Sequence, residues 1–336
     1  QPTNTFDSYD GVNSIREDLA DVIFNISPTE TPFMSNASKG TATNTLHEWQ
    51  TDSLADVAVN AQVEGDDYAG EARGATARLT NYTQISSKSV TISGTDDAVE
   101  NAGMGTQMAY QLAKMGKEIK RDMENAMIGI EQAKVAGNAS TARKSASVGT
   151  WYGPTSGINN YSKNGSPSAV PVGTGATAIA GGTNRTYAEA LLTAGLLQSF
   201  TLGGEPDTVL MSPSHKQTAS GFNGVATKYK DASDKVSIGT TDIYVSDFGE
   251  VAFVPDRFQN ANRVDILQMD MWSVDFLRPF QTTDLAKTGD SDKKLLLAEW
   301  TFTAKATNAN YGIFNLNNFF ISYYGTLTKV ILIKVI

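Results

Sequence analysis

The sequence predicts a mixed α+β fold in which one long helix packs on strands from distant parts of the chain. Three observations predict it. Apolar residues recur at steps of three and four over residues 96–136, as in an amphipathic helix. Alternating and β-branched residues in 46–94 and 271–316 are typical of strands. Between 184 and 270, strand patterns alternate with helical ones, which indicates an α/β segment.

The composition sets the size of the core and the character of the surface. The 336 residues suffice for one large domain or two modest ones with a sizeable core. Charged residues make up 19% and there are 29 glycines, which favours many loops and a largely uncharged polar surface. The net charge of −9 argues against a general basic surface for nucleic acid.

Residues 1–45 predict an extended N-terminal arm that contains one short helix. The motif Ser14-Ile15-Arg16-Glu17 is a capping box, and apolar residues follow it at helical spacing. Pro28 and Pro32 should end this helix and impose extended backbone. Because the segment cannot form a core alone, we expect it to pack on something else.

Residues 46–94 predict a long β-hairpin. The outgoing strand covers 46–51 and the returning strand 81–93. An acidic tip lies between them and contains Glu64, Asp66, Asp67 and Glu71. Because an isolated two-stranded hairpin is marginally stable in water, we expect it to lie against a neighbour.

Residues 95–137 predict the longest helix. Asp96 and Asp97 favour its start through the helix dipole, and Gly137 favours its end. At 1.5 Å per residue it would approach about 60 Å. Three glycines mark positions where it could bend or shorten: Gly103, Gly105 and Gly116.

The remaining segments complete the expected order. Residues 138–270 begin with a Gly/Ser/Asn/Thr-rich loop and continue with helices at 186–200 and from Pro213. Their expected strands are 208–211, 243–245, 251–254 and 264–267. Residues 271–318 supply terminal strands, best defined at 295–297 and 300–304, that we expect to cover the long helix. The apolar tail 319–336 carries two lysines, which favours a terminal strand or an added segment over a membrane anchor.

A search for catalytic motifs predicts no enzyme. The sequence contains neither a phosphate-binding GxxxxGK[ST] loop nor a GxSxG nucleophile motif. The absence of cysteine excludes thiolate catalysis and disulfides. Ser214 and His215 are adjacent but do not form a dyad by adjacency, and we expect His215 on the surface of a helix's first turn. The acidic tip lacks the ligand spacing of a calcium loop. We therefore predict no catalytic residue, no cofactor and no metal site.

Four stretches in order along the chain carry a family resemblance. They are ISPTETPF at 26–33, TLHEWQTD at 45–52, VPDRF at 254–258 with LRPF at 277–280, and LAKTGDS at 285–291 with EW at 299–300. Together they resemble the major capsid proteins of tailed bacteriophages, in particular the short-tailed, elongated-head group.

The resemblance implies the capsid fold that tailed phages share with encapsulins. Its parts would be an N-terminal arm (1–45), an extended hairpin loop (46–94), a peripheral domain with a long spine helix (95–137) and late strands (271–318), and an axial α/β domain (138–270). Residues 319–336 do not match the family ending. No lysine lies between Lys39 and Lys88, so the hairpin tip offers no amine for the Lys–Asn isopeptide bond that some such capsids form.

The resemblance also implies a function and partners. The protein would be a structural subunit that assembles into hexamers and pentamers and then into an icosahedral or prolate shell around double-stranded DNA. Scaffold, portal and decoration proteins would be its partners, and no membrane would be involved. It would be assembled in the bacterial host cytoplasm and reside in the virion. The subunit-interface residues would be Pro28, Pro32, Phe33, Trp49, Glu64, Asp66, Asp67, Glu71, Arg73 and Arg78.

The sequence is also compatible with two functions other than a viral shell. An encapsulin-type compartment would use the same fold to enclose cargo enzymes. A surface-layer or adhesin-like β protein would suit the low charge and the abundance of Thr, Asn and Gly. The long Met-rich helix argues against the second.

Overall fold

A computed structural model gives the fold. It describes residues 29–55, 57–65, 67, 70, 74–99, 106–155, 158–222 and 242–317. The predicted helix of the N-terminal arm and the apolar tail lie outside these residues. No helix among the described residues is long and apolar enough to cross a membrane.

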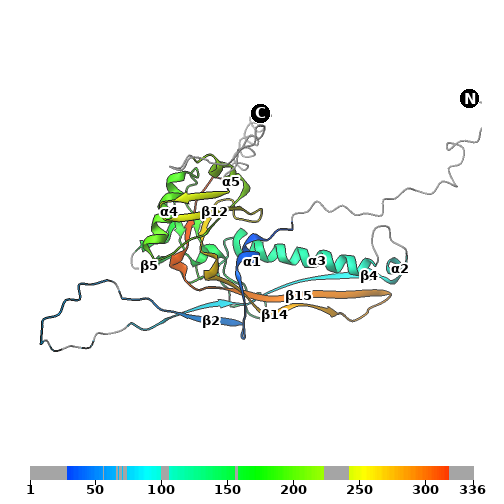
Figure 1. Ribbon diagram of the computed structural model, residues 1–336. Coiled ribbons are helices and arrows are strands. Elements are labelled where there is room, and N and C mark those ends of the chain that lie inside the picture. Colours follow the sequence, from blue (N-terminus) through cyan, green and yellow to red (C-terminus); the bar gives the residue numbers. More distant parts are fainter. Residues whose placement is uncertain are drawn as a thin grey trace, which may run out of the picture.

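A four-stranded sheet combines strands from the first and the last hundred residues of the chain. Its order is β1-β14-β15-β4, with β1 at Ser38–Thr41, β4 at Gln84–Ser93, β14 at Trp272–Asp284 and β15 at Ser291–Ala304. The sheet is antiparallel except for β1, which pairs in parallel with β14. The long strands extend to one side of the body (Figure 1).

Helix α3 lies along this sheet but is shorter than predicted. It covers Gln107–Glu124, and the separate short helix α2 covers Gly94–Ala98. A π-helical turn, η1 (Asn125–Gly129), follows α3, and the backbone is extended at Ile130. The prediction of one helix over 95–137 is therefore wrong at both ends. Apolar residues continue at helical spacing past residue 127, which is why the sequence predicts a longer helix. In the structure, Glu131 lies beyond the helix and forms an ion pair with Arg263.

The apolar face of α3 confirms the predicted covering by terminal strands. Met115, Ile119 and Met123 are buried and share one core with Leu296 and Trp300 of β15. Strand β4 covers the same helix. This second strand was predicted as part of the hairpin, so the returning segment divides at Thr83: β3 stays in the hairpin and β4 enters the central sheet.

A six-stranded sheet carries the α/β segment. Its order is β11-β12-β10-β13-β16-β7, with β7 at Tyr161–Ser162, β10 at Thr208–Met211, β11 at Ile243–Ser246, β12 at Gly249–Pro255, β13 at Val264–Leu267 and β16 at Tyr311–Ile313. Helices α4 (Glu189–Thr201) and α5 (Pro213–Ser220) pack on it. The helices and strands expected within 138–270 are confirmed. The expected boundary at 270 is wrong, because β16 from the segment 271–318 pairs with β13 and completes this sheet instead of joining the strands over α3.

Shorter elements complete the described chain. Helix α1 covers Pro32–Asn36, and three two-stranded sheets pair β2 (Leu46–Thr51) with β3 (Ala77–Tyr82), β5 (Pro154–Thr155) with β6 (Ile158–Asn159), and β8 (Pro167–Ala169) with β9 (Ala180–Gly181). The short 3-10 helices are η2 (Val148–Trp151), η3 (Met269–Met271) and η4 (Thr307–Ala309). Pro32 opens a helix instead of imposing extended chain, since its fixed φ suits a first helical position.

The six-stranded sheet belongs to both hydrophobic cores. Leu210 and Leu267 point into the core beneath α3, which also contains three buried tryptophans. Val209 and Ile266, one residue away in each strand, point into the core beneath α4. Because successive side chains of a strand face opposite sides, these two strands join the cores into one body.

Candidate protein–protein interface

A hairpin projects from the body and is firmly fixed at its root. Strands β2 and β3 pair antiparallel from Leu46↔Tyr82 to Thr51↔Ala77. The Trp49 indole Nε1–H donates to the Ala304 carbonyl at 2.9 Å, and the Asn81 amide donates to the Phe302 carbonyl at 2.9 Å. Beyond β2 and β3 the chain runs far from the body before it returns (Figure 1).

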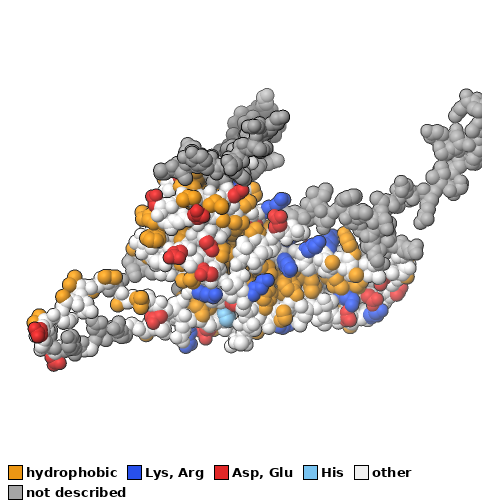
Figure 2. Space-filling model, in the orientation of Figure 1, with side chains coloured by type: hydrophobic (Ala, Val, Ile, Leu, Met, Phe, Trp, Pro, Cys, Tyr) orange, Lys and Arg blue, Asp and Glu red, His pale blue; other side chains and the backbone are white. Residues whose placement is uncertain are grey.

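The outgoing half of this loop carries exposed apolar side chains. Exposed fractions are 96% for Leu54, 104% for Val57, 96% for Val59 and 75% for Val63. The three valines occupy odd positions, so an extended chain presents them on one side. Figure 2 shows apolar side chains along the projecting loop, away from any core. Large apolar side chains gathered in this way mark an interaction surface.

These valines are not among the interface residues predicted from the sequence, which in this loop are the charged residues of the acidic tip. The available signal was the period-two alternation of residues 57–63, a strand pattern without a partner strand. Among the predicted tip residues, Glu64 and Asp67 are exposed. Asp66, Glu71 and Arg73 lie outside the described residues.

Other predicted interface residues lie within the subunit's own structure. Arg78 on β3 faces Glu48 of its own hairpin, with Nη1 and Oε2 3.9 Å apart. The Trp49 ring packs on Trp151 with centroids 5.3 Å apart. Together these contacts stiffen the hairpin root.

The start of the arm is fixed in the same way. Phe33 is buried, with its ring centroid 6.0 Å from that of Trp272 and 6.4 Å from that of Phe302. The backbone N–H groups of Phe33 and Met34 donate to the two carboxylate oxygens of Glu124, at 2.7 and 2.9 Å. Pro32 opens this short helix, while Pro28 lies outside the described residues. Phe33 thus fastens the arm to its own subunit.

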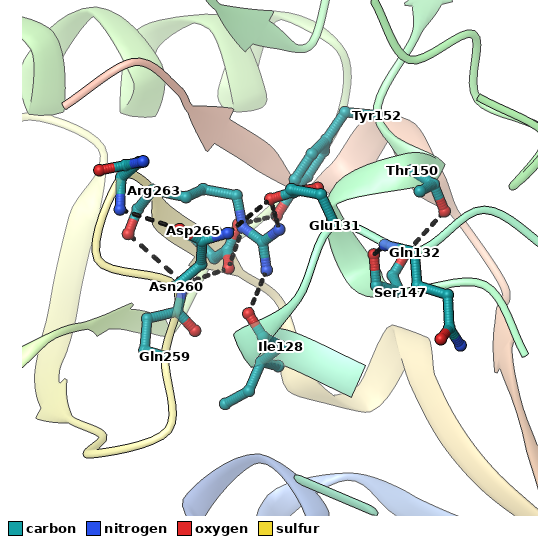
Figure 3. A network of polar contacts seen from close by, with 11 residues as sticks. Ile128, Glu131, Gln132, Ser147, Thr150, Tyr152, Gln259, Asn260, Arg263 and Asp265 are labelled. Atoms are coloured by element: carbon teal, nitrogen blue, oxygen red, sulfur yellow. Dashed lines mark hydrogen bonds and ion pairs between the residues drawn. The ribbon is translucent and has the colours of Figure 1, made fainter. Parts of the chain in front are cut away.

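A buried ionic network joins the end of α3 to the six-stranded sheet (Figure 3). Arg263, fully buried on the turn before β13, donates through Nε to Asp265 at 2.9 Å and through Nη2 to the Ile128 carbonyl at 2.8 Å. Its Nη1 pairs with Glu131. Burial alone would lower the pKa of Arg263, but Asp265 and Glu131 hold that pKa above its usual value. The guanidinium therefore remains a fixed cation between the two cores.

A second ionic cluster fixes the point where the chain leaves the hairpin for the central sheet. Glu299 of β15 is buried and accepts a hydrogen bond from the Thr83 hydroxyl at 2.8 Å. Arg143 and Arg278 bind its two oxygens at 2.6 and 2.8 Å. Burial raises the pKa of Glu299, but Thr83 and the arginines outweigh burial and hold the pKa below its usual value. The direction of the hairpin is thereby set by charge-assisted bonds.

The structure corrects the expectation for His215. Its side chain is buried instead of lying on the surface. Its Nε2 lies 2.8 Å from the Ala261 carbonyl, its ring packs on Tyr187, and burial lowers its pKa. The Ser214 hydroxyl bonds to that of Ser212 at 3.0 Å. In the described part of the chain, no group of three or more metal-binding side chains comes together.

Comparison with known proteins gives concordant matches. The family model described as SU10 major capsid protein matches residues 1–317. The major capsid protein of Escherichia phage Phieco32 is 28% identical over 328 residues, which cover 88% of this chain and 92% of that relative.

Solved structures match over nearly the whole chain. The capsid of a native GTA particle has a TM-score of 0.61 at 9% identity and covers 92% of this chain and 98% of its own. The capsid of cyanophage A-1(L) has a TM-score of 0.61 at 13% identity, covering 90% and 97%. Microbacterium phage Oxtober96 gives 0.60 at 10% identity, covering 92% and 98%. At such low identity these structures show the fold.

Proposed function

Because the chain belongs to the SU10 major capsid protein family, whose members form phage capsid shells, we propose that its projecting hairpin and N-terminal arm make the contacts between copies of the subunit. The observation that carries this proposal is the row of exposed apolar side chains at Leu54, Val57, Val59 and Val63. Family membership disfavours the encapsulin-type and the surface-layer alternatives.

We assign each predicted segment a role in the shell. The central sheet and α3 would act as the peripheral plate, and the segment 138–270 would lie near the centre of hexamers and pentamers. The arm (1–45) would cross a neighbouring subunit. The shell would be icosahedral or prolate, and the short-tailed, elongated-head group remains a prediction.

The apolar loop can supply most of the proposed contact free energy. Burying one valine side chain contributes roughly 1.5–3 kcal/mol, before the entropy cost of association. An exposed ion pair contributes about 0–1 kcal/mol, so the loss of a single acidic side chain at the tip should be tolerated. Many modest contacts per subunit then combine into a stable shell through multivalency.

The proposed partners follow from enclosing a genome. Assembly in the host cytoplasm, with scaffold, portal and decoration proteins as partners, would precede packaging. A chain with net charge −9 is suited to enclosing double-stranded DNA without sequence-specific contacts. No cofactor or catalytic step is part of this function.

The test exchanges the valines for serine: Val57→Ser, Val59→Ser and Val63→Ser together. We expect folded subunits that no longer form closed particles in electron microscopy and that elute as small species in size-exclusion chromatography. The matched control changes the intervening residues, Ala58→Ser, Asn60→Ser and Gln62→Ser, and should assemble normally. Normal particles from the valine variant would refute the proposed hairpin contact.

A further inference from the structure

Three exposed lysines follow one another along the outward side of helix α3. Lys114, Lys117 and Lys120 are exposed, whereas Met115 and Ile119 of the same helix are buried in the core beneath it. Residues three apart are neighbours on a helix surface, with Cβ atoms about 5–6 Å from each other, so the lysines form a row. We call this row the basic face of α3. Figure 2 shows Lys and Arg side chains over this helix.

The acidic residues of α3 do not neutralise the basic face. Glu118 and Asp122 both pair with Lys88 of β4, at 3.2 and 3.1 Å. The buried Glu124 accepts the N–H groups of helix α1. Within the described residues, no ion pair or side-chain hydrogen bond includes a lysine of the basic face. Like charges at this spacing repel each other, so the basic face favours an anionic partner from outside the subunit.

The composition of the basic face suits phosphate better than a protein surface. Protein interfaces are depleted in lysine and depend on buried aromatic or apolar anchors. In the described part of the chain, the large apolar side chains that are exposed lie outside α3. A lysine ammonium contacts phosphate as a point charge, and duplex DNA carries one negative charge about every 1.7 Å along its axis. Each lysine of the row can therefore meet a different phosphate.

Elsewhere in the described chain, positive charge is paired or scattered. Arg143 and Arg263 bind carboxylates of their own subunit. The exposed Lys39, Lys144 and Lys163 lie in β1, in an isolated bridge to residue 135, and directly after β7. They share no helix or strand, so they form no row. In a chain with net charge −9, the basic face of α3 is thus a local exception to the overall acidity.

We propose that the basic face of α3 lines the inside of the shell and binds the phosphates of packaged duplex DNA without regard to sequence. The inference rests on the proposed function, since a shell around DNA brings this partner to α3. Three contacts per subunit bind weakly and reversibly, which lets DNA move during packaging. Many subunits acting together then hold the packaged DNA through multivalency.

DNA binding by full-length subunits before assembly tests the basic face directly. The measurement is the fluorescence anisotropy of a labelled short duplex over a range of salt concentrations. Because each phosphate contact releases counterions, wild-type affinity should fall roughly 40-fold between about 50 and about 200 mM salt. In the combined variant Lys114→Gln, Lys117→Gln and Lys120→Gln, the slope of log affinity against log salt should decrease by about three, roughly one per lysine. Glutamine has nearly the helix propensity of lysine, so α3 should stay folded.

A matched control separates the basic face from net charge. Lys39→Gln, Lys144→Gln and Lys163→Gln together remove the same three charges from exposed positions and should bind DNA like wild type. Equal losses in the two variants, or no loss in either, would overturn the proposal. Polyglutamate serves as a second probe, and binding it as tightly as the duplex would overturn DNA in favour of an acidic protein partner. These subunits are unassembled, so failure of the proposed hairpin contact would not affect the result.

Lysine acetylation in particles tests the inward orientation. DNA-filled and empty wild-type particles are treated with a small amine reagent and compared by mass spectrometry. Relative to the other lysines, Lys114, Lys117 and Lys120 should be labelled several-fold less in filled particles, because bound phosphate shields the amines. Equal labelling in filled and empty particles would overturn the contact with packaged DNA.

Discussion

At the scale of single residues, the buried charges are the least expendable contacts of this protein. Arg263 bridges Asp265, Glu131 and a backbone carbonyl between the two cores. The sequence gives no sign of this role, since Arg257 six residues earlier belongs to the same loop and is exposed. A buried arginine is distinguished only by which carboxylates the tertiary fold brings to it.

Replacing this arginine should therefore destabilise the fold. In Arg263→Met, Asp265 and Glu131 would remain buried without their cation, at a cost of about 3–5 kcal/mol in the free energy of unfolding. Urea denaturation of the subunit measures it. Arg257→Met, at the exposed position, should change that free energy by no more than about 0.5 kcal/mol. Equal stability of the two variants would show that the network contributes nothing net.

At the scale of elements, local patterns predicted the kinds of segment better than their ends or their neighbours. The strands and helices between 186 and 267 are where the pattern placed them. Helix α3 is shorter: a π-helical turn follows it, the backbone is extended at Ile130, and Glu131 pairs with Arg263 of a distant segment. The returning half of the hairpin divides at Thr83, since Glu299, more than two hundred residues later, accepts its hydroxyl. Such partners lie beyond any local pattern.

One substitution should have opposite effects in two helices. A Cβ at Gly195 of α4 would lie 2.6 Å from Ile266 Cδ1 and 2.8 Å from the Tyr311 ring, both buried, whereas a Cβ at Gly116 of α3 would meet Leu296 at an ordinary 3.9 Å. Gly195→Ala should thus lower the free energy of unfolding by about 1–3 kcal/mol through overpacking. Gly116→Ala should raise it by roughly 0.5–1 kcal/mol through helix propensity. Thermal denaturation of both variants checks the signs; a stabilised Gly195→Ala would contradict the close packing of α4.

At the scale of the whole molecule, the order of segments was predictable, and the family resemblance placed them in one fold. The side chains that the hairpin exposes were less predictable. The sequence directed attention to charge at the hairpin tip, whereas the structure exposes valines before it. It also directed attention to Phe33 as a contact between subunits, whereas Phe33 lies in its own subunit's core.

Because Phe33 is part of the core, a deletion that tests the role of the N-terminal arm in assembly must end before it. Deleting residues 1–33 would remove a core side chain together with the arm, so a failure to assemble would be ambiguous. Deleting residues 1–28 leaves α1 in place. We expect such subunits to show unchanged denaturation and yet to form no normal particles by electron microscopy. Normal particles would rule out an essential arm.

The passage from β3 to β4 has a mechanical consequence. Only Thr83 separates the hairpin from the edge strand of the central sheet, and that strand pairs with β15 along ten successive residues. Tension on the loop would act along the length of β4 and would shear all ten pairings together instead of peeling them one at a time. A shell under internal pressure would thus pull on each subunit in the direction in which its sheet resists most.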